Sequence, residues 1–153
     1  MVLYVLRHGE AEPWAPSDAE RRLTAHGKAQ VRAVAMAAAA RLDNLQRVIS
    51  SPYRRARETA AELLRALDSS AELVIDPALT PESPLRGLDS LAECGGAGEV
   101  LLVSHQPLVG ELLRWLCDED GLEPMGTAHL TALELTGFAR GGARLLWRER
   151  PPH

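Results

Sequence analysis

The sequence predicts an α/β domain: a three-layer α/β/α sandwich with a mostly parallel central sheet and helices on both faces. Three observations support this class. Short apolar, β-rich runs alternate with stretches of helical spacing over roughly the first 116 residues. The first run, residues 2–6, is almost wholly apolar, as expected of a strand covered on both faces. The last quarter alternates polar and apolar residues around a glycine pair, a pattern typical of a hairpin.

Length and composition are those of one ordinary globular domain. The chain has 153 residues, of which 46% are hydrophobic and 25% are charged, enough for one core but not for two. The sequence contains no internal repeat and no linker that would divide it. We therefore expect residues 1–153 to form a single domain.

Charge and hydropathy argue against two classes of partner. The formal net charge is -4 and the sequence pI is about 5.7, so no overall positive field exists to hold nucleic acid or an anionic membrane. Only five residues separate Met1 from Arg7, too few for the apolar region of a signal peptide. No apolar run approaches the roughly 18 residues that a membrane span needs. We expect a cytoplasmic protein, with Cys94 and Cys117 as free thiols.

The predicted elements follow from periodicity and from start and stop signals. Thr24 is a good N-cap for the first helix. Ser51 can cap the second helix, with Pro52 as its first residue, where the missing proline N–H costs nothing. Gly95 and Gly96 end the third helix. The expected helices are residues 24–42, 52–67, 84–94 and a fourth from 107 onward, and the expected strands are residues 2–6, 47–49, 73–75, 99–103, 129–135 and 144–147.

Cationic and imidazole side chains follow three of the predicted strands, where each strand ends. Arg7 and His8 follow the first strand, and His105 follows the fourth. The second strand leads into a helix that carries Arg54 and Arg55. In open α/β sheets, ligands bind at the carboxyl ends of the strands, where helix N-termini present free N–H groups to anions. We therefore expect these side chains to meet at one edge of the sheet.

Such a set of side chains suits a phosphoryl group. Arginine forks bind its oxygens in pairs and stay charged at any relevant pH. A neutral His8 is a competent nucleophile toward phosphorus if its second nitrogen donates to a backbone carbonyl. Gly9 lets the backbone turn sharply and lets the phosphate approach the main chain. His105 can donate a hydrogen bond to the phosphoryl oxygens, in a protonated state that the bound phosphate favours.

Four segments carry a resemblance to a known family. LRHGEA at residues 6–11 resembles the RHG signature of the histidine phosphatase superfamily, also called phosphoglycerate mutase-like. DAERRLTAHG at residues 18–27 resembles its D-x-x-R-x-L-T-x-x-G segment, and SSPYRRARETA at residues 50–60 resembles its S-S-P-x-x-R-A-x-x-T-A block. VSHQPLVG at residues 103–110 resembles the segment with the second histidine. The four occur in the family order, so the match is far more specific than three letters alone.

The resemblance implies a phosphoglycerate mutase-like fold and a metal-independent phosphatase that needs no cofactor. The short chain, the lack of a large insertion after the second arginine and the H-x-P-L-V-G wording look most like the SixA-type phosphohistidine phosphatases. The implied reaction takes a phosphoryl group from phosphohistidine on a partner protein, through a phosphohistidine enzyme, and releases inorganic phosphate. The implied catalytic residues are His8, Arg7, Arg55 and His105, and we expect Gly9, Ser104, Arg54 and Glu82 to bind the substrate.

Two other functions stay open at this point. Many relatives use a glutamate after the third strand to protonate the leaving oxygen of a phosphoester. The segment LTPE at residues 79–82 departs from that pattern, so a small-molecule phosphoester phosphatase would need Glu82 as the acid. A non-catalytic phosphate-recognition module would keep the pocket without turnover. Metal catalysis has little support, because His26 and His129 lack the spacing of metal ligands.

Several of these residues also have plainer interpretations. Arginines on one helix usually form a solvated face, so Arg57 is expected to pair with a nearby glutamate. Asp18 and Arg21 are expected to tie a surface loop to the core. Trp14 in the loop at residues 13–20 is a weak candidate for substrate contact. The residues expected in the core on helix faces are Met36, Leu112 and Trp115.

Overall fold

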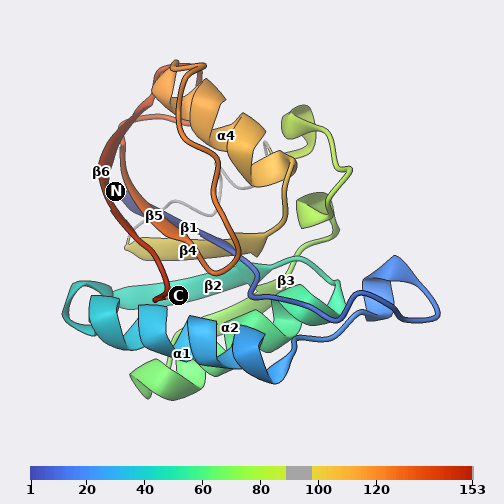
Figure 1. The fold of residues 1–153 in the computed structure, drawn as a ribbon. Helices are drawn as coiled ribbons and strands as arrows, with labels where there is room; N and C mark the ends of the chain where they lie inside the picture. Colours follow the sequence, from blue (N-terminus) through green and yellow to red (C-terminus); the bar gives the residue numbers. More distant parts are fainter. Residues whose placement is uncertain (89–97, 153) are drawn as a thin grey trace.

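In the computed structural model, which describes residues 1–88 and 98–152, a six-stranded sheet lies between two layers of helices (Figure 1). The strand order is β3-β2-β4-β1-β5-β6. The first four strands in this order are mutually parallel, β5 runs antiparallel to β1, and β6 runs antiparallel to β5. The mostly parallel sheet and the C-terminal hairpin are thus confirmed. The strands are β1 (Val2–Arg7), β2 (Leu45–Ser50), β3 (Glu72–Ile75), β4 (Glu99–Ser104), β5 (Leu130–Leu135) and β6 (Ala143–Glu149).

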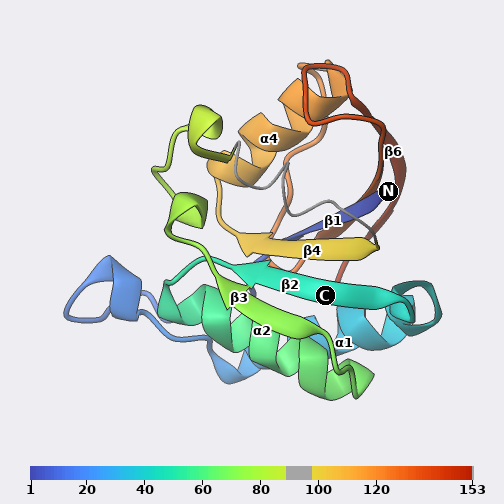
Figure 2. The same ribbon diagram turned by 180° about the vertical axis from the view of Figure 1, so that it is seen from behind.

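Helices cover both faces of the sheet, as the predicted sandwich requires. Helices α1 (Ala25–Ala38) and α2 (Arg54–Leu67) lie on one face, and α4 (Leu108–Cys117) lies on the other (Figures 1 and 2). Thr24 caps α1 as expected, because its Oγ1 accepts a hydrogen bond from the N–H of Gly27 at 2.9 Å. The chain continues past α1 as a 3₁₀ turn at Ala39–Leu42, so the predicted helix changes type before it ends.

Alternate residues of the central strands fill two separate cores. Tyr4 and Leu6 of β1 pack against α1 and α2, whereas Leu3 and Val5 pack against α4. All four side chains are at most 3% exposed. Because both faces of β1 are buried, its sequence is a continuous apolar run rather than an alternating one.

The second helix begins later than predicted. Pro52 was expected as its first residue, but α2 starts at Arg54. The N–H of Ser51 donates to the carbonyl of Val103 at 3.0 Å, so the pairing of β2 with β4 continues one residue beyond the strand. Ser51 Oγ then accepts a hydrogen bond from the N–H of Tyr53 at 3.2 Å, which makes a turn before the helix instead of a cap on it.

Two further predictions differ from the structure. Met36 was expected in the core but is 63% exposed, because it lies on the side of α1 opposite the buried stripe of Val31 and Ala35. Of the helix predicted over residues 84–94, the structure describes residues 84–88, where Leu85–Leu88 form a 3₁₀ turn rather than an α-helix, and residues 89–94 lie outside the described residues. Leu112 is buried and Trp115 is half-buried, in agreement with their predicted helix-face positions.

The carboxyl ends of three parallel strands lie next to one another. Arg7 at the end of β1 pairs in register with Ser104 at the end of β4, and Ser50 of β2 pairs with Val103. The loop that follows β1 projects from this edge beside the start of α2 (Figure 1). A single antiparallel bridge between Ala11 and Leu23 closes that loop at its base. The topology therefore brings the three predicted strand exits together.

Across residues 1–88 and 98–152, no helix has the length and apolar character to cross a membrane. Cys117 is a free, half-buried thiol, and Cys94 lies outside the described residues.

Candidate active site

Two imidazole rings and one guanidinium group meet at the carboxyl edge of the sheet. His8 follows β1 and His105 follows β4, and their ring centroids are 5.0 Å apart. Arg55, the second residue of α2, brings its Nε to 3.3 Å from Nε2 of His8. The three residues are buried, with exposures of 7% for His8, 1% for His105 and 4% for Arg55. We refer to these three residues, for which the sequence predicts catalytic roles, as the catalytic cluster.

Hydrogen bonds set the tautomer of His8. Its Nδ1 lies 2.7 Å from the carbonyl oxygen of Gly9, and a carbonyl can only accept, so Nδ1 carries the proton. Its Nε2 faces Nε of Arg55, which can only donate, so Nε2 presents its lone pair. This is the arrangement expected of a nucleophilic histidine whose second nitrogen is held by the backbone.

The surroundings keep His8 uncharged. Burial is the main cause that lowers its pKa to about 4, and the positive charges of Arg55 and Arg7 act in the same direction. The hydrogen bond to the carbonyl of Gly9 opposes this shift but is outweighed. At neutral pH the imidazole is therefore neutral, with its proton on Nδ1, and its Nε2 lone pair is available for attack on phosphorus.

His105 is held by the segment between β2 and α2. Its Nε2 lies 2.7 Å from Oγ of Ser51, and its ring packs edge-on against Tyr53 with centroids 5.2 Å apart. Its Nδ1 is buried and has no hydrogen-bond partner among the described residues. Burial, followed by the charges of His8 and Arg55, lowers the pKa of His105 to about 2. The protonated state expected for catalysis therefore needs the negative charge of a bound phosphoryl group.

Asp18 holds the guanidinium group of Arg55 from the side of the loop. Nη1 of Arg55 donates to the backbone carbonyl of Asp18 at 2.7 Å, and Nη2 donates to its carboxylate at 3.1 Å. Asp18 also accepts a hydrogen bond from Arg21 at 2.9 Å. Partial burial raises the pKa of Asp18, but the hydrogen bonds from Arg21 and Arg55 outweigh it and lower the pKa. The pair of Asp18 and Arg21 that was expected to tie the loop to the core lies within the loop, and the tie itself is made by Asp18 with Arg55 of the cluster.

Arg7 lies beside the cluster and is only partly buried. Its Nη1 donates to the carbonyl of Met125 at 3.1 Å, while its Nε has no partner among the described residues. Burial and then the charge of Arg55 lower the pKa of Arg7, and an arginine still remains protonated. One side of this guanidinium is anchored to the backbone and the other side retains a free donor.

Gly9 is needed for packing more than for a turn. A Cβ on Gly9 would lie 2.6 Å from the carbonyl oxygen of Gly27 at the start of α1, far inside van der Waals contact. The N–H of Gly9 donates to Oγ1 of Thr59 at 3.1 Å, so it is already engaged. Thr59 in turn donates to the carbonyl of Arg55 at 2.7 Å within α2. The bond from Gly9 to Thr59 therefore ties α2 to the segment after β1.

Sequence reasoning assigned no site role to Ser51 and Thr59. A signal for Thr59 was present, since it lies four residues after Arg55, a spacing that places both on one side of a helix, whereas Ser51 lies before α2 and had no such signal. Ser51 contacts His105 and Thr59 contacts Gly9, so both act on the cluster through other residues.

Three residues with predicted substrate roles lie differently. The hydroxyl of Ser104 is buried and donates to the carbonyl of Leu79 at 2.7 Å, a bond that ties β4 to the segment after β3. Arg54 pairs with Glu58 at 3.2 Å on the outer side of α2. Glu82 is exposed, and within the described part of the chain it has no hydrogen bond or ion pair with a cluster residue. In the same part of the chain, no three His, Cys, Asp or Glu side chains are placed to hold a metal ion.

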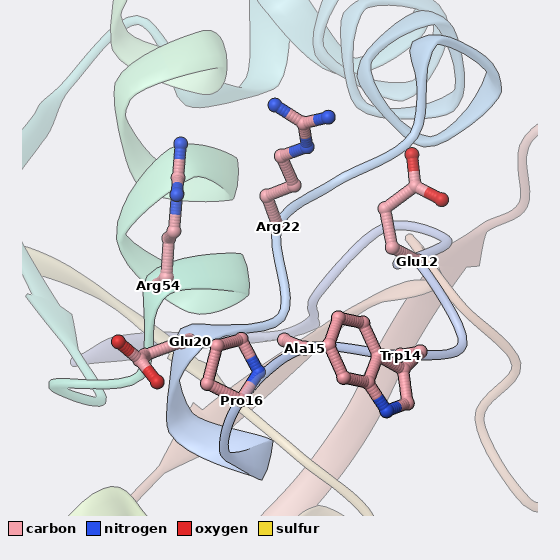
Figure 3. Close-up of a pocket in the computed structure, with 7 residues that line it drawn as sticks. All are labelled: Glu12, Trp14, Ala15, Pro16, Glu20, Arg22 and Arg54. Atoms are coloured by element: carbon pink, nitrogen blue, oxygen red, sulfur yellow. The ribbon is translucent and has the colours of Figure 1, made fainter.

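A cavity of about 340 Å³ is lined by the loop at residues 12–22 and by Arg54 of α2 (Figure 3). Trp14, which lines this cavity, has a large apolar side chain that is 78% exposed. Arg22 and Arg54 extend in the same direction in Figure 3, one from the loop and one from α2. The lining residues are Glu12, Trp14, Ala15, Pro16, Glu20, Arg22 and Arg54.

Comparisons with known proteins show the family of this chain. The phosphohistidine phosphatase SixA of Escherichia coli (strain K12) is 30% identical over 154 residues, which cover 99% of this chain and 94% of that protein. A SixA homolog of Haemophilus influenzae is 36% identical over 124 residues, or 74% of this chain and 75% of that protein. The structure of the protein histidine phosphatase SixA complexed with tungstate superposes with a TM-score of 0.86 at 30% identity, covering 99% of this chain and 97% of that one. The profile of the histidine phosphatase superfamily (branch 1) matches residues 3–80, and the chain belongs to that family.

Proposed function

We propose that this protein hydrolyses phosphohistidine on a partner protein through a covalent phosphohistidine intermediate on His8. The observation that carries the proposal is the lone pair of His8 Nε2, which is unprotonated and held beside Arg55 and His105. The names of the SixA relatives support a phosphohistidine substrate. The single domain, the cytoplasmic location and the lack of nucleic-acid and membrane partners stay predictions from the sequence.

Three donors in and beside the cluster are suited to the phosphoryl oxygens. Nε of Arg55 now donates to His8 and can turn its hydrogen bond to an oxygen of the substrate. Nε of Arg7 and Nδ1 of His105 lack partners among the described residues, and an unpaired buried donor gains most from a bound anion. The tungstate in the related SixA structure is itself a tetrahedral oxyanion, which supports an oxyanion pocket in this family.

The reaction follows in two displacements. Nε2 of His8 attacks phosphorus, the P–N bond of the substrate breaks, and the leaving imidazole nitrogen of the substrate takes a proton from solvent. Water then attacks the phosphorus on His8, the new P–N bond breaks with its electron pair returning to Nε2, and inorganic phosphate leaves with the oxygen of water. Nδ1 keeps its hydrogen bond to Gly9 throughout, so the ring does not need to turn between the two steps.

The hydrogen bond between Ser51 and His105 matters for the same reaction. If the Ser51 hydroxyl donates to Nε2, the proton of a neutral His105 sits on Nδ1, where it can be donated to a phosphoryl oxygen. As negative charge enters the site, protonation of His105 becomes easier and strengthens that bond. Ser51 is therefore a positioning residue, and His105 is the group that contacts the phosphoryl oxygens.

A comparison of substrates tests the proposal. A phosphohistidine protein, a phosphoramidate, a sugar phosphate and an aryl phosphate are offered to the enzyme with a metal chelator present. We expect turnover of the two P–N substrates, loss of that turnover in His8→Gln, and no loss in His26→Gln, a matched change at an exposed histidine. A need for divalent ions, or phosphoester turnover that vanishes in Glu82→Gln, would favour a different enzyme. No turnover of any substrate would favour a recognition module.

A further inference from the structure

We propose that the cavity beside the catalytic cluster is a docking subsite for the polypeptide that flanks the phosphohistidine of the substrate protein. We call it the Trp14 cavity, and its lining residues are those given above. The inference rests on the proposed function. The occupant to which we commit is a peptide segment with an apolar side chain next to a carboxylate.

Residues that are neighbours in the sequence line the Trp14 cavity and contact or form the catalytic cluster. Arg54 lines the cavity, and the next residue, Arg55, belongs to the cluster. On the loop, Arg22 lines the cavity while its neighbour Arg21 turns to Asp18, the residue that holds Arg55. The loop thus contacts Arg55 of the cluster through Asp18 and lines the cavity through Arg22. A chain whose phosphohistidine reaches His8 can place adjacent residues there.

The lining of the Trp14 cavity fits an amphipathic peptide. Trp14, Ala15 and Pro16 provide an apolar side, and an exposed indole is among the side chains that contribute most to protein interfaces. Arg22 has no hydrogen bond or ion pair through its side chain within residues 1–88 and 98–152. A carboxylate on the incoming segment would give that guanidinium a partner.

Arg22 and Glu12 are the charged lining residues whose side chains have no partner in the described part of the chain, and Arg22 is the cation of this pair that can anchor a carboxylate. Arg54 pairs with Glu58 at 3.2 Å, and Glu20 accepts from the hydroxyl of Ser17 at 2.9 Å. With two glutamates and two arginines in its lining, the cavity has no net charge to hold a free dianion. An apolar contact with one ion pair at its side is therefore the better match.

The loop that forms the cavity is already ordered by its own hydrogen bonds. The N–H of Glu12 donates to the carbonyl of Arg22 at 2.8 Å, and Nε of Arg21 donates to the carbonyl of Glu12 at 2.7 Å. The N–H of Leu23 donates to the carboxylate of Glu58 on α2 at 2.7 Å. A preformed surface loses little conformational entropy when a partner binds. The cavity volume of about 340 Å³ lies in the range of about 300–1,000 Å³ that is usual for binding sites.

The test measures kcat and KM for a phosphohistidine protein and for small phosphoramidate, with Trp14→Ala and Arg22→Gln. Because each change removes one anchor, we expect KM for the protein to rise about tenfold while its kcat is kept. The ratio of kcat/KM between protein and phosphoramidate should fall by at least about fivefold. Met36→Ala and Arg140→Gln are matched controls, because both side chains are exposed away from the cavity.

Short phosphohistidine peptides identify the occupant. Wild-type enzyme should prefer a peptide with leucine and aspartate beside the phosphohistidine over the same peptide with alanines, and Arg22→Gln should remove the preference for aspartate. Equal changes for protein and phosphoramidate, or no change at all, would overturn the docking role. A rise in KM for a sugar phosphate in Trp14→Ala, with the protein unaffected, would assign the cavity to a small molecule. If wild-type enzyme hydrolyses neither P–N substrate, the proposed function fails instead.

Discussion

Lowering the pH from 7 to 5 should destabilise this protein through the two histidines of the catalytic cluster. Burial and neighbouring cations lower the pKa of His8 to about 4 and that of His105 to about 2. In the unfolded chain both return to the ordinary value of about 6.5. Between pH 6.5 and 5, therefore, the unfolded state binds a proton at each residue and the folded state does not. The free energy of unfolding falls as the pH falls.

The size of the effect follows from the linkage of protonation to folding. Each pH unit below about 6.5 costs about 1.4 kcal/mol per histidine as long as the folded imidazole stays neutral. At pH 5 this amounts to about 2 kcal/mol for each residue and about 4 kcal/mol for both. That is a large part of the roughly 5–15 kcal/mol by which domains are stable. Asp18, whose pKa is lowered, stays ionised in this window and does not contribute.

Urea denaturation at pH 7 and pH 5 measures the effect. His8→Gln and His105→Gln should each reduce the loss of stability between the two pH values by about 2 kcal/mol relative to wild type. His26→Gln changes an exposed histidine and should lose as much stability as wild type. If all four proteins lose the same free energy, the two histidines are not held neutral in the folded state, and the electrostatic account of the cluster is wrong.

Three further predictions concern the residues around the cluster. Gly9→Ala places a methyl group 2.6 Å from a backbone carbonyl oxygen, so urea denaturation should show a free energy of unfolding that is lower by about 2–3 kcal/mol. Gly121→Ala points its methyl group into open space and should show no such loss. Equal losses in the two variants would contradict the packing role of Gly9. Arg55→Lys keeps the charge but removes the Nε donor and the Nη groups that Asp18 holds, so kcat/KM should fall about 100-fold, and an unchanged value would refute the role of Nε in binding the phosphoryl group. Ser51→Ala removes the partner of His105 Nε2 and should lower kcat about tenfold. Ser51→Thr keeps a hydroxyl and should restore part of the lost kcat. An unchanged kcat in Ser51→Ala would contradict a positioning role for Ser51.

Sequence reasoning reached the fold because its signals are local and redundant. The buried stripe of α1, the Thr24 cap and the apolar run of β1 each depend on neighbours within a few residues. Parallel pairing then places the strand exits at one edge, so the meeting of His8 and His105 follows from topology. The same logic failed for Met36, which is apolar yet lies outside the buried stripe.

The details that sequence could not supply depend on contacts between distant segments. Arg55 and Asp18 are 37 positions apart, and the pairing of their side chains needs the loop to fold back over α2. The hydroxyl of Ser104 follows a strand as a phosphate-binding residue would, yet it bonds to the carbonyl of Leu79, 25 positions away. Local patterns show which residues carry useful chemistry, but not which of their hydrogen-bonding groups are already occupied.

Trapping of the phosphoenzyme tests the central claim most directly. Enzyme mixed with labelled phosphoramidate is quenched within milliseconds, and the label is located by peptide mapping. We predict an acid-labile phosphohistidine on His8 that forms and decays at rates consistent with turnover and is absent in His8→Gln. Turnover by wild-type enzyme with no labelled protein at any time, or with the label on another residue, would contradict the nucleophilic role of His8.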